Sequence, residues 1–345
     1  MRAWEPGRPE WRRLLSSSWG PAGLYPASRR VVLEAGGGYI LVGLRDSIAR
    51  TGWSLGRDAA GGAACIGGAC REPVAAAAAI IALSGSYTAL CVTLQDYNPY
   101  TARVREVLLG AGWWRMTVLY PRILDLTPYR EDPGLYPSRL PKKSRNRWRS
   151  FLRRGGVVEE EWRPSRIASE IYRVLNSSRV RQGRPVPGKW RNPRWVAGLV
   201  SWMETGVREG WLRIYVAWMD RLAGFTCIQL TRLQGLVTWF LIDPRYARHG
   251  VGNALLTEAV MRLASSTRTP ILQYGYWRPV NPGLNRFLER QLFSVGRETV
   301  ICSPGPASPL LRLSTPLARF AEKTSSRLLA AAQHYLREAL EAVRG

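Results

Sequence analysis

The chain has 345 residues, which at ~150 residues per domain predicts two domains, and 46% of its residues are hydrophobic. Its most apolar stretch, Val74 to Leu83, is too short to cross a membrane, and the first residues lack the apolar core of a signal peptide, so a cytoplasmic protein is expected. The 50 Lys and Arg residues against 25 Asp and Glu give a net charge of +25. This charge favours polyanionic partners such as tRNA, other nucleic acid, an anionic membrane surface or a phosphate-rich cofactor, whereas an arginine-rich proteome is the alternative interpretation.

The five cysteines do not predict a metal site. Cys65 and Cys70 are separated by four residues, but structural zinc needs a second ligand pair, and the remaining cysteines and the two histidines are isolated. A local disulfide or a pair of small buried residues explains Cys65 and Cys70 better.

The first half of the chain predicts an α/β block. Residues 1–30 have no hydrophobic period and predict an irregular arm. Residues 31–135 alternate between strand-like and helix-like patterns. After strand-like runs from Gly38, the predicted elements are a helix Val74–Leu83, a strand Tyr87–Gln95, a helix Tyr100–Leu109 and a strand Trp114–Leu126.

The densest basic run of the chain follows, and residues 136–160 predict a basic connecting helix that Gly155 and Gly156 close. Two interpretations of this helix remain open. Its cations form a solvated face between two domains, or they bind nucleic-acid phosphates while Trp148 stacks on a base. The nucleic-acid-binding candidates are Lys142, Lys143, Arg145, Arg147, Trp148, Arg149 and Arg153.

Residues 161–305 predict a second α/β block of similar size and element order, so we expect an internal duplication. Its predicted helices are Ile167–Leu175, Arg194–Glu209, Val251–Ala264 and Gly283–Gln291. Its predicted strands are Trp211–Met219, Leu222–Leu230, Leu236–Ile242, Ile271–Tyr276 and Val295–Cys302. Residues 306–345 predict an amphipathic helix that packs on its own domain, with dimerisation and membrane-surface docking as alternatives.

The segment from Trp239 to Leu263 carries the clearest chemistry. A strand runs into Pro244, a basic turn follows, and a helix starts at Gly250 and Gly252. Glycines let backbone N–H groups approach a ligand closely, and a helix N-terminus adds partial positive charge, so this turn suits a pyrophosphate. The segment resembles the acyl-donor motif of the GNAT (Gcn5-related N-acetyltransferase) superfamily, with Ala247 in place of the usual Gln or Arg. The matching residues are Asp243-Pro244, Tyr246, Gly250-Val251-Gly252 and Leu255-Leu256.

A second resemblance covers roughly residues 80 to 300. It is to the Fem-type aminoacyl-tRNA-dependent peptidoglycan-bridge enzymes and related two-domain acyltransferases. The matching segments are the strand Pro121 to Glu131, the basic run PKKSRNRWRSFLRRGGVV, Gln273 to Tyr276, and NPGLNRFLERQLF from Asn281. Leu288 stands where GNAT enzymes commonly have a tyrosine and Fem enzymes a lysine, and Leu292 replaces a glycine. The resemblance implies two GNAT-like domains in tandem, the first degenerate, with mixed sheets flanked by helices.

These resemblances imply an acyl-donor site in the second block, in which backbone groups hold the phosphates of acetyl-CoA or another acyl-CoA. Its cofactor-binding candidates are Leu241, Ile242, Arg248, His249, Gly250, Val251, Gly252, Asn253 and Asn281. The candidates for proton transfer are Tyr274 and Tyr276, expected on one strand face, and Asn281. Core packing of the two tyrosines and an exposed loop position for His249 are the alternatives.

We therefore predict an acyltransferase that transfers an acyl group from acyl-CoA to an amine acceptor. The first alternative keeps the fold but takes aminoacyl-tRNA as the donor, which the net charge of +25 favours. The second alternative is a non-catalytic GNAT-fold protein that binds nucleic acid, and it rests on the departures at Ala247 and Leu288.

Overall fold

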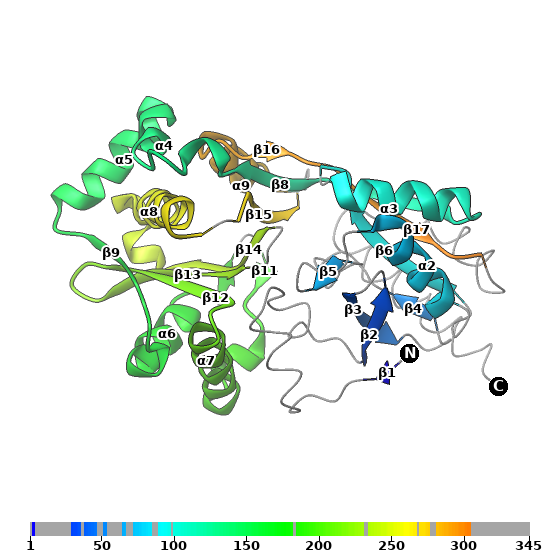
Figure 1. Cartoon of the computed structure of the whole chain (residues 1–345). Helices are drawn as coiled ribbons and strands as arrows, with labels where there is room; N and C mark the ends of the chain where they lie inside the picture. The colour runs from blue at the N-terminus through cyan, green and yellow to red at the C-terminus, as the bar shows by residue number, and fades with distance from the viewer. Residues whose placement is uncertain are drawn as a thin grey trace.

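The structure is a computed structural model that describes residues 2–3, 29–35, 38–46, 51–53, 64–66, 72–84, 89–97, 99–181, 184–230, 234–267, 269–276 and 281–304. The C-terminal helix predicted at 306–345, Cys70, and all of the predicted arm except residues 2–3 and 29–30 lie outside these ranges. Within them the chain forms two mixed α/β units, each built on one large sheet (Figure 1).

The first sheet has the strand order β1-β2-β3-β4-β6-β17-β7, and β5 pairs with β3. Helices α2 (Pro73–Ser84) and α3 (Pro99–Gly110) pack together and share a core with buried residues of β6 and β17. The strands are β1 (Arg2–Ala3), β2 (Arg29–Ala35), β3 (Gly38–Asp46), β4 (Thr51–Trp53), β5 (Ala64–Ile66), β6 (Ala89–Gln95), β7 (Trp114–Leu119) and β17 (Glu298–Cys302).

The second sheet has the strand order β16-β8-β15-β14-β13-β12-β9. All its neighbouring strands are antiparallel except β14 and β15, which are parallel. The strands are β8 (Pro121–Asp125), β9 (Val157–Glu160), β12 (Leu212–Trp218), β13 (Leu222–Leu230), β14 (Gly235–Ile242), β15 (Ile271–Tyr276) and β16 (Ser294–Val295).

Helices cover both faces of the second sheet (Figure 1). On one face lie α4 (Leu135–Arg139), α5 (Lys142–Arg153), α8 (Val251–Ser266) and α9 (Pro282–Arg290); on the other lie α6 (Ala168–Asn176) and α7 (Pro193–Arg208). Because side chains alternate along a strand, Phe240 and Ile242 of β14 pack toward α8, while Trp239 and Leu241 pack toward α6 and α7. No helix in the described ranges is long and apolar enough to span a membrane.

Two segments predicted as single strands each contribute to both sheets. The predicted strand Trp114–Leu126 divides at Tyr120 into β7, which belongs to the first sheet, and β8, which belongs to the second. The predicted strand Val295–Cys302 likewise divides into β16 and β17. Glu298 pairs with Leu119 and Val295 with Arg122 in one uninterrupted register, and the Gly296 N–H donates to the Pro121 carbonyl at 2.7 Å. The two segments therefore form one antiparallel ribbon that crosses from sheet to sheet.

The second unit also differs in detail from the sequence-based expectation. The predicted connecting helix at 136–160 comprises two helices, α4 and α5, and ends in β9, which pairs with β12 at the edge of the sheet. The loop before α7 contains the short strands β10 (Val180–Arg181) and β11 (Arg184–Pro185) and the 3-10 helix η4 (Gly188–Arg191). These elements matter for the site because β10 and η4 lie beside α6.

Each half of the chain contributes a strand to the sheet of the other half, which we call the exchange of strands. A residue near the C-terminal end of the second block therefore belongs to the core of the first unit. Ile301 of β17 has no exposed surface and packs with α2 and α3. We predict that Ile301→Ala lowers the free energy of unfolding by about 2–5 kcal/mol, the usual loss for a buried isoleucine. Urea unfolding measures the change. Val295→Ala on β16, whose side chain is 50% exposed, is the matched control and is expected to change little; equal effects of the two variants would contradict the exchange.

Candidate functional site

The parallel strands β14 and β15 separate toward their C-terminal ends. They pair only at Gly235 with Leu272 and at Leu236 with Gln273, whereas β14 stays paired with β13 as far as Ile242. A β-bulge between the pairs at Val237 and Trp239 bends β14 at this point. Ligands of mixed α/β sheets bind beyond the carboxyl ends of parallel strands where neighbours diverge, so this split is the candidate site.

Asp243 anchors the turn that leaves β14. Its side chain has no exposed surface and accepts hydrogen bonds from the Arg245 N–H at 3.1 Å, from Arg245 Nη2 at 2.7 Å and from Arg173 Nη1 of α6 at 2.5 Å. Burial by itself would raise the pKa of this carboxyl, but the hydrogen bonds from Arg245 and Arg173 outweigh it and lower the pKa. Asp243 thereby caps the 3-10 helix η5 (Pro244–His249) and fixes where α8 begins.

Close packing explains both glycines that were predicted to approach a phosphate, Gly250 and Gly252. Gly250 has φ +86°, and a Cβ there would collide with the backbone carbonyl of Arg147 in α5. Gly252 faces β14, and a Cβ there would lie 2.8 Å from Ile242 Cδ1. The glycines thus allow α5 and β14 to approach α8 closely, and neither requires a ligand for its explanation.

The N-terminus of α8 is nevertheless left uncapped. No side chain caps it, and within the described ranges no oxygen accepts a hydrogen bond from the N–H groups of Val251, Gly252 or Asn253. The first N–H groups of a helix carry partial positive charge and attract anions or carbonyl oxygens. All three residues are buried, so bulk solvent has little access to these donors.

Two of the predicted proton-transfer residues, Tyr274 and Asn281, have structural partners. Tyr274 packs its ring against Phe240 and Phe293 at centroid distances of 5.5 and 6.2 Å, and burial raises the pKa of its hydroxyl, so it holds its proton at neutral pH. A bulge with Gly275 at φ +54° interrupts the pairing of β15 with β8. The pairing of β15 with β8 is therefore irregular between Gln273 and Tyr276, and the side chain of Tyr276 lies outside the described part of the structure. Asn281 caps α9 through its side-chain oxygen, 3.4 Å from the Leu284 nitrogen.

The two departures from the family pattern on and after α9 have structural roles. Leu288 is buried in the core beneath α8, so no polar group from this position enters the split. Leu292 takes φ +62°, the left-handed conformation for which the family uses glycine, and the N–H groups of Leu292 and Phe293 return to carbonyls of α9.

The predicted nucleic-acid-binding residues of helix α5 point in two directions. Trp148 points inward and donates to Glu258 of α8 at 3.0 Å, and Arg145 donates to the Ser138 carbonyl at 2.7 Å. The others are exposed and form no ion pair with any described residue, and most of them line a shallow hollow of about 560 Å³. These exposed cations are Lys142, Lys143, Arg147, Arg149 and Arg153.

The exposed surface of α5 continues onto the turn before α8. Arg154 Nη1 donates to His249 Nδ1 at 2.8 Å, and Arg248 is exposed beside it. His249 is half-buried between α5 and η5, not an isolated loop histidine. The basic surface and the candidate split therefore meet at the N-terminus of α8.

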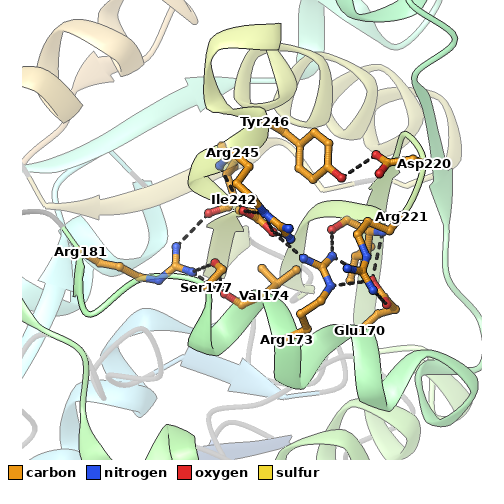
Figure 2. Close-up of polar contacts among 12 residues, drawn as sticks. Glu170, Arg173, Val174, Ser177, Arg181, Asp220, Arg221, Ile242, Arg245 and Tyr246 are labelled. Atoms are coloured by element: carbon orange, nitrogen blue, oxygen red, sulfur yellow. Dashed lines mark hydrogen bonds and ion pairs between the residues drawn. The ribbon is translucent and has the colours of Figure 1, made fainter.

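Arg173 and Arg181 are the site residues that sequence patterns did not reveal. Arg181 of β10 donates to the Ile242 carbonyl at 2.9 Å, to Ser177 Oγ at 3.0 Å and to the Val174 carbonyl (Figure 2). Both arginines come from elements about 60 to 70 residues upstream of β14, in segments where many other arginines occur. No spacing signal distinguished them.

Neither known family models nor curated protein sequences match this sequence. Solved structures do match its fold. FemX superposes with a TM-score of 0.63 at 9% identity over 91% of this chain and 100% of that chain. L-PGS from Bacillus licheniformis gives 0.56 at 14% identity over 92% and 98%. The C-terminal domain assigned to a lysylphosphatidylglycerol synthetase from Agrobacterium fabrum gives 0.54 at 12% identity over 88% and 93%.

At these identities the likeness establishes the fold. The chain is an α/β protein, with mixed sheets flanked by helices, that shares its overall fold with FemX and L-PGS, so the expected fold class is confirmed.

The contact between Gly250 and α5 gives a stability prediction. Gly250→Ala places a Cβ in the left-handed region and against the Arg147 carbonyl, so helix α5 must shift. We expect a loss of about 1–2 kcal/mol from the backbone conformation and about 2 kcal/mol more from the collision. Gly210→Ala is the matched control, because Gly210 has φ +77° but open space at its Cβ. Chemical denaturation compares the two, and equal losses would show that α5 does not press on this turn.

The lowered pKa of Asp243 gives a pH prediction. A carboxyl whose pKa is depressed by folding contributes stability above its unfolded pKa of about 3.9, and that contribution is lost as the pH falls through the folded value. Asp243→Asn should therefore cost on the order of 3 kcal/mol at pH 7 and should flatten the stability curve below about pH 4. Thermal unfolding from pH 7 to pH 2 measures both effects. The exposed Asp132→Asn is the control, and a curve for Asp243→Asn parallel to that of the wild type would refute the assignment.

Proposed function

We propose that this chain is an acyltransferase that takes an aminoacyl group from aminoacyl-tRNA and transfers it to an amine acceptor. In the reaction the acceptor nitrogen forms a bond to the acyl carbon and the ester C–O bond to the tRNA breaks. The proton that the amine gives up ends on the released tRNA oxygen, which leaves as a hydroxyl group. The observation behind this proposal is the group of exposed cations on α5, which form no ion pair with any described residue. Helix α5 packs directly on the N-terminus of α8.

The charge pattern of α5 destabilises an isolated helix. Lys142 and Lys143 occupy its first turn, where no acidic residue balances the positive end of the helix dipole. Lys143 and Arg147, and Arg149 and Arg153, are like charges four residues apart, which repel each other on a helix surface. A polyanion removes both penalties, so the pattern suits binding of phosphates better than helix stability.

Some other arginines of the same unit are paired. Arg173, Arg213 and Arg245 each bind a carboxylate at 2.9 Å or less. The exposed cations on α5 have no such partner among the described residues, and they lie together on one helix. A phosphate backbone supplies many anions at a spacing that a helix can follow.

The tight packing around α8 favours a donor whose charged part remains outside. Gly250 lies against α5 and Gly252 against β14, so a coenzyme pyrophosphate would compete with protein backbone for the turn. An aminoacyl-tRNA could leave its phosphates on α5 and insert only its terminal ester into the split between β14 and β15. The fold shared with FemX agrees with this donor, since the Fem group is aminoacyl-tRNA-dependent.

A second candidate keeps acetyl-CoA or another acyl-CoA as the donor. The observation that favours it is the set of N–H groups at Val251, Gly252 and Asn253, which lack acceptors in the part of the chain described. In either case these donors, with the end of β14, would polarise the acyl carbonyl as charge develops on its oxygen.

The donor is tested by binding of a tRNA mixture at several salt concentrations. We predict that replacing Lys142, Lys143, Arg149 and Arg153 together with glutamine weakens binding at least tenfold at about 100 mM salt. The slope of log affinity against log salt should fall in magnitude by about 0.7–0.9 for each phosphate that the variant no longer binds.

The matched control replaces four exposed arginines on the opposite face, Arg166, Arg191, Arg194 and Arg208, with glutamine, which changes the net charge equally. It should bind tRNA nearly as the wild type does. Equal weakening by both variants would show non-specific attraction and contradict the proposal. Calorimetry with acetyl-CoA completes the test, because micromolar binding of that ligand would favour the second candidate.

A further inference from the structure

Among the described residues, the C-terminal end of β14 has one cation more than it has carboxylates. Four guanidinium groups gather there, from Arg173, Arg181, Arg221 and Arg245, and three carboxylates face them. Asp243 binds Arg173 and Arg245, and Glu170 binds Arg173 and Arg221. The third carboxylate, Asp220, accepts a hydrogen bond from Tyr246 at 2.5 Å.

Arg181 forms no ion pair with any carboxylate among the described residues, and Asp243 acts on its charge only from beyond ion-pair distance. All its hydrogen bonds within the described ranges go to neutral oxygens, those of Ile242, Val174 and Ser177. The C-terminal dipole of α6, where Val174 and Ser177 lie, supplies about half a negative charge at most. Its guanidinium is half-buried and held in place from three sides, so its charge is fixed in position but not neutralised.

The hydrogen-bonding capacity of Arg181 is also incomplete. A guanidinium has five N–H donors. Nη2 donates hydrogen bonds to two oxygens at the end of α6, Nη1 donates a single bond to Ile242, and Nε is buried without an acceptor. Nε is shielded from any ligand, so the second N–H of Nη1 is the donor left for an oxyanion, for which charge-assisted bonds are about twice as strong as neutral ones.

Arg181 lies on a different face of the sheet from the cations of α5, which the proposed function assigns to the donor. It reaches Ile242 from the face of the sheet that carries α6, η4 and α7, whereas α5 and α8 lie on the other face. Trp190 and Trp239 pack together on this same face at a centroid distance of 5.4 Å. The two substrates of a transferase must meet at the end of β14, so a group bound here would arrive opposite the donor.

From this placement we infer that Arg181 binds an oxyanion group, carboxylate or phosphate, of the amine-bearing acceptor. That the bound group belongs to the acceptor rests on the proposed function. The existence of an anion site at Arg181 does not. The acceptor class is then an amine that also carries an acidic group, held so that its nitrogen lies near the split between β14 and β15.

The test measures thermal stabilisation of the full chain by inorganic phosphate and, separately, by glutarate, with chloride keeping the ionic strength constant. The background is the α5 variant with four glutamines, so that anions on α5 do not contribute. A ligand that binds only the folded state stabilises it by RT ln(1 + [L]/Kd), so a saturable rise in Tm reports binding. Whichever of the two anions gives the tighter site identifies the acidic group as phosphate or carboxylate.

We expect Arg181→Gln to abolish the saturable rise and Arg181→Lys to weaken the apparent affinity about tenfold, because lysine cannot hold the same acceptors. Arg262→Gln is the matched control, since Arg262 also donates to a backbone carbonyl, that of Val158 at 2.8 Å, but lies away from the end of β14. It should leave the rise unchanged. Circular dichroism checks the fold, and if Arg181→Gln does not fold, Arg181→Lys decides.

Unchanged anion affinity in the Arg181 variants, or no saturable rise in the background protein with either anion, would overturn the inference. A loss of stability with unchanged anion affinity would assign Arg181 to linking α6 with β14 and nothing more. Because no tRNA or acyl group enters this measurement, its failure is distinct from failure of the proposed aminoacyl transfer.

Discussion

The antiparallel ribbon formed by residues 114–125 and 294–302 ties the two sheets into one molecule. Its first half lies inside the first sheet, where β17 is inserted between β6 and β7, and its second half supplies β8 and β16 to the second sheet. A strand inside a sheet is bonded on both sides, so neither sheet can be completed by one half of the chain. The internal duplication expected from the sequence therefore does not yield two separable units, since each sheet requires a strand from the other half.

The ribbon also determines where the candidate site can form. Because β8 pairs with β15, it holds β15 on the side away from β14, and the two parallel strands share only two paired positions. The bulge that includes Gly275 and the bulge near Trp239 bend the two strands at the same end of the sheet. The split therefore results from the pairing of β15 with β8 together with the local bulges. Helix α8 begins beside it because Arg173 and Arg245 hold Asp243 in place.

Charge is distributed unequally around this split. On the α6 side, Asp243 and Glu170 bind the half-buried Arg173 and the exposed Arg245 and Arg221, and these ion pairs define the shape of the turn. On the α5 side, exposed cations have no acidic partner among the described residues. Paired charges of the first kind fix geometry, whereas unpaired charges of the second kind attract a polyanion over a distance and depend on salt. This difference supports the proposal that a polyanionic donor binds on the α5 side.

The sequence by itself determined the fold class, the order of the central elements and the turn at Gly250, because hydrophobic period, helix caps and glycine conformations are local properties. The sequence could not show that the predicted strand Trp114–Leu126 serves two sheets, since alternation is identical whichever partner a strand finds. It also could not show that Gly250 and Gly252 face α5 and β14. A glycine permits any close approach, and only the tertiary structure decides which group approaches. The same limit applies to Arg181, which has no local feature that marks it until β10 brings it to Ile242.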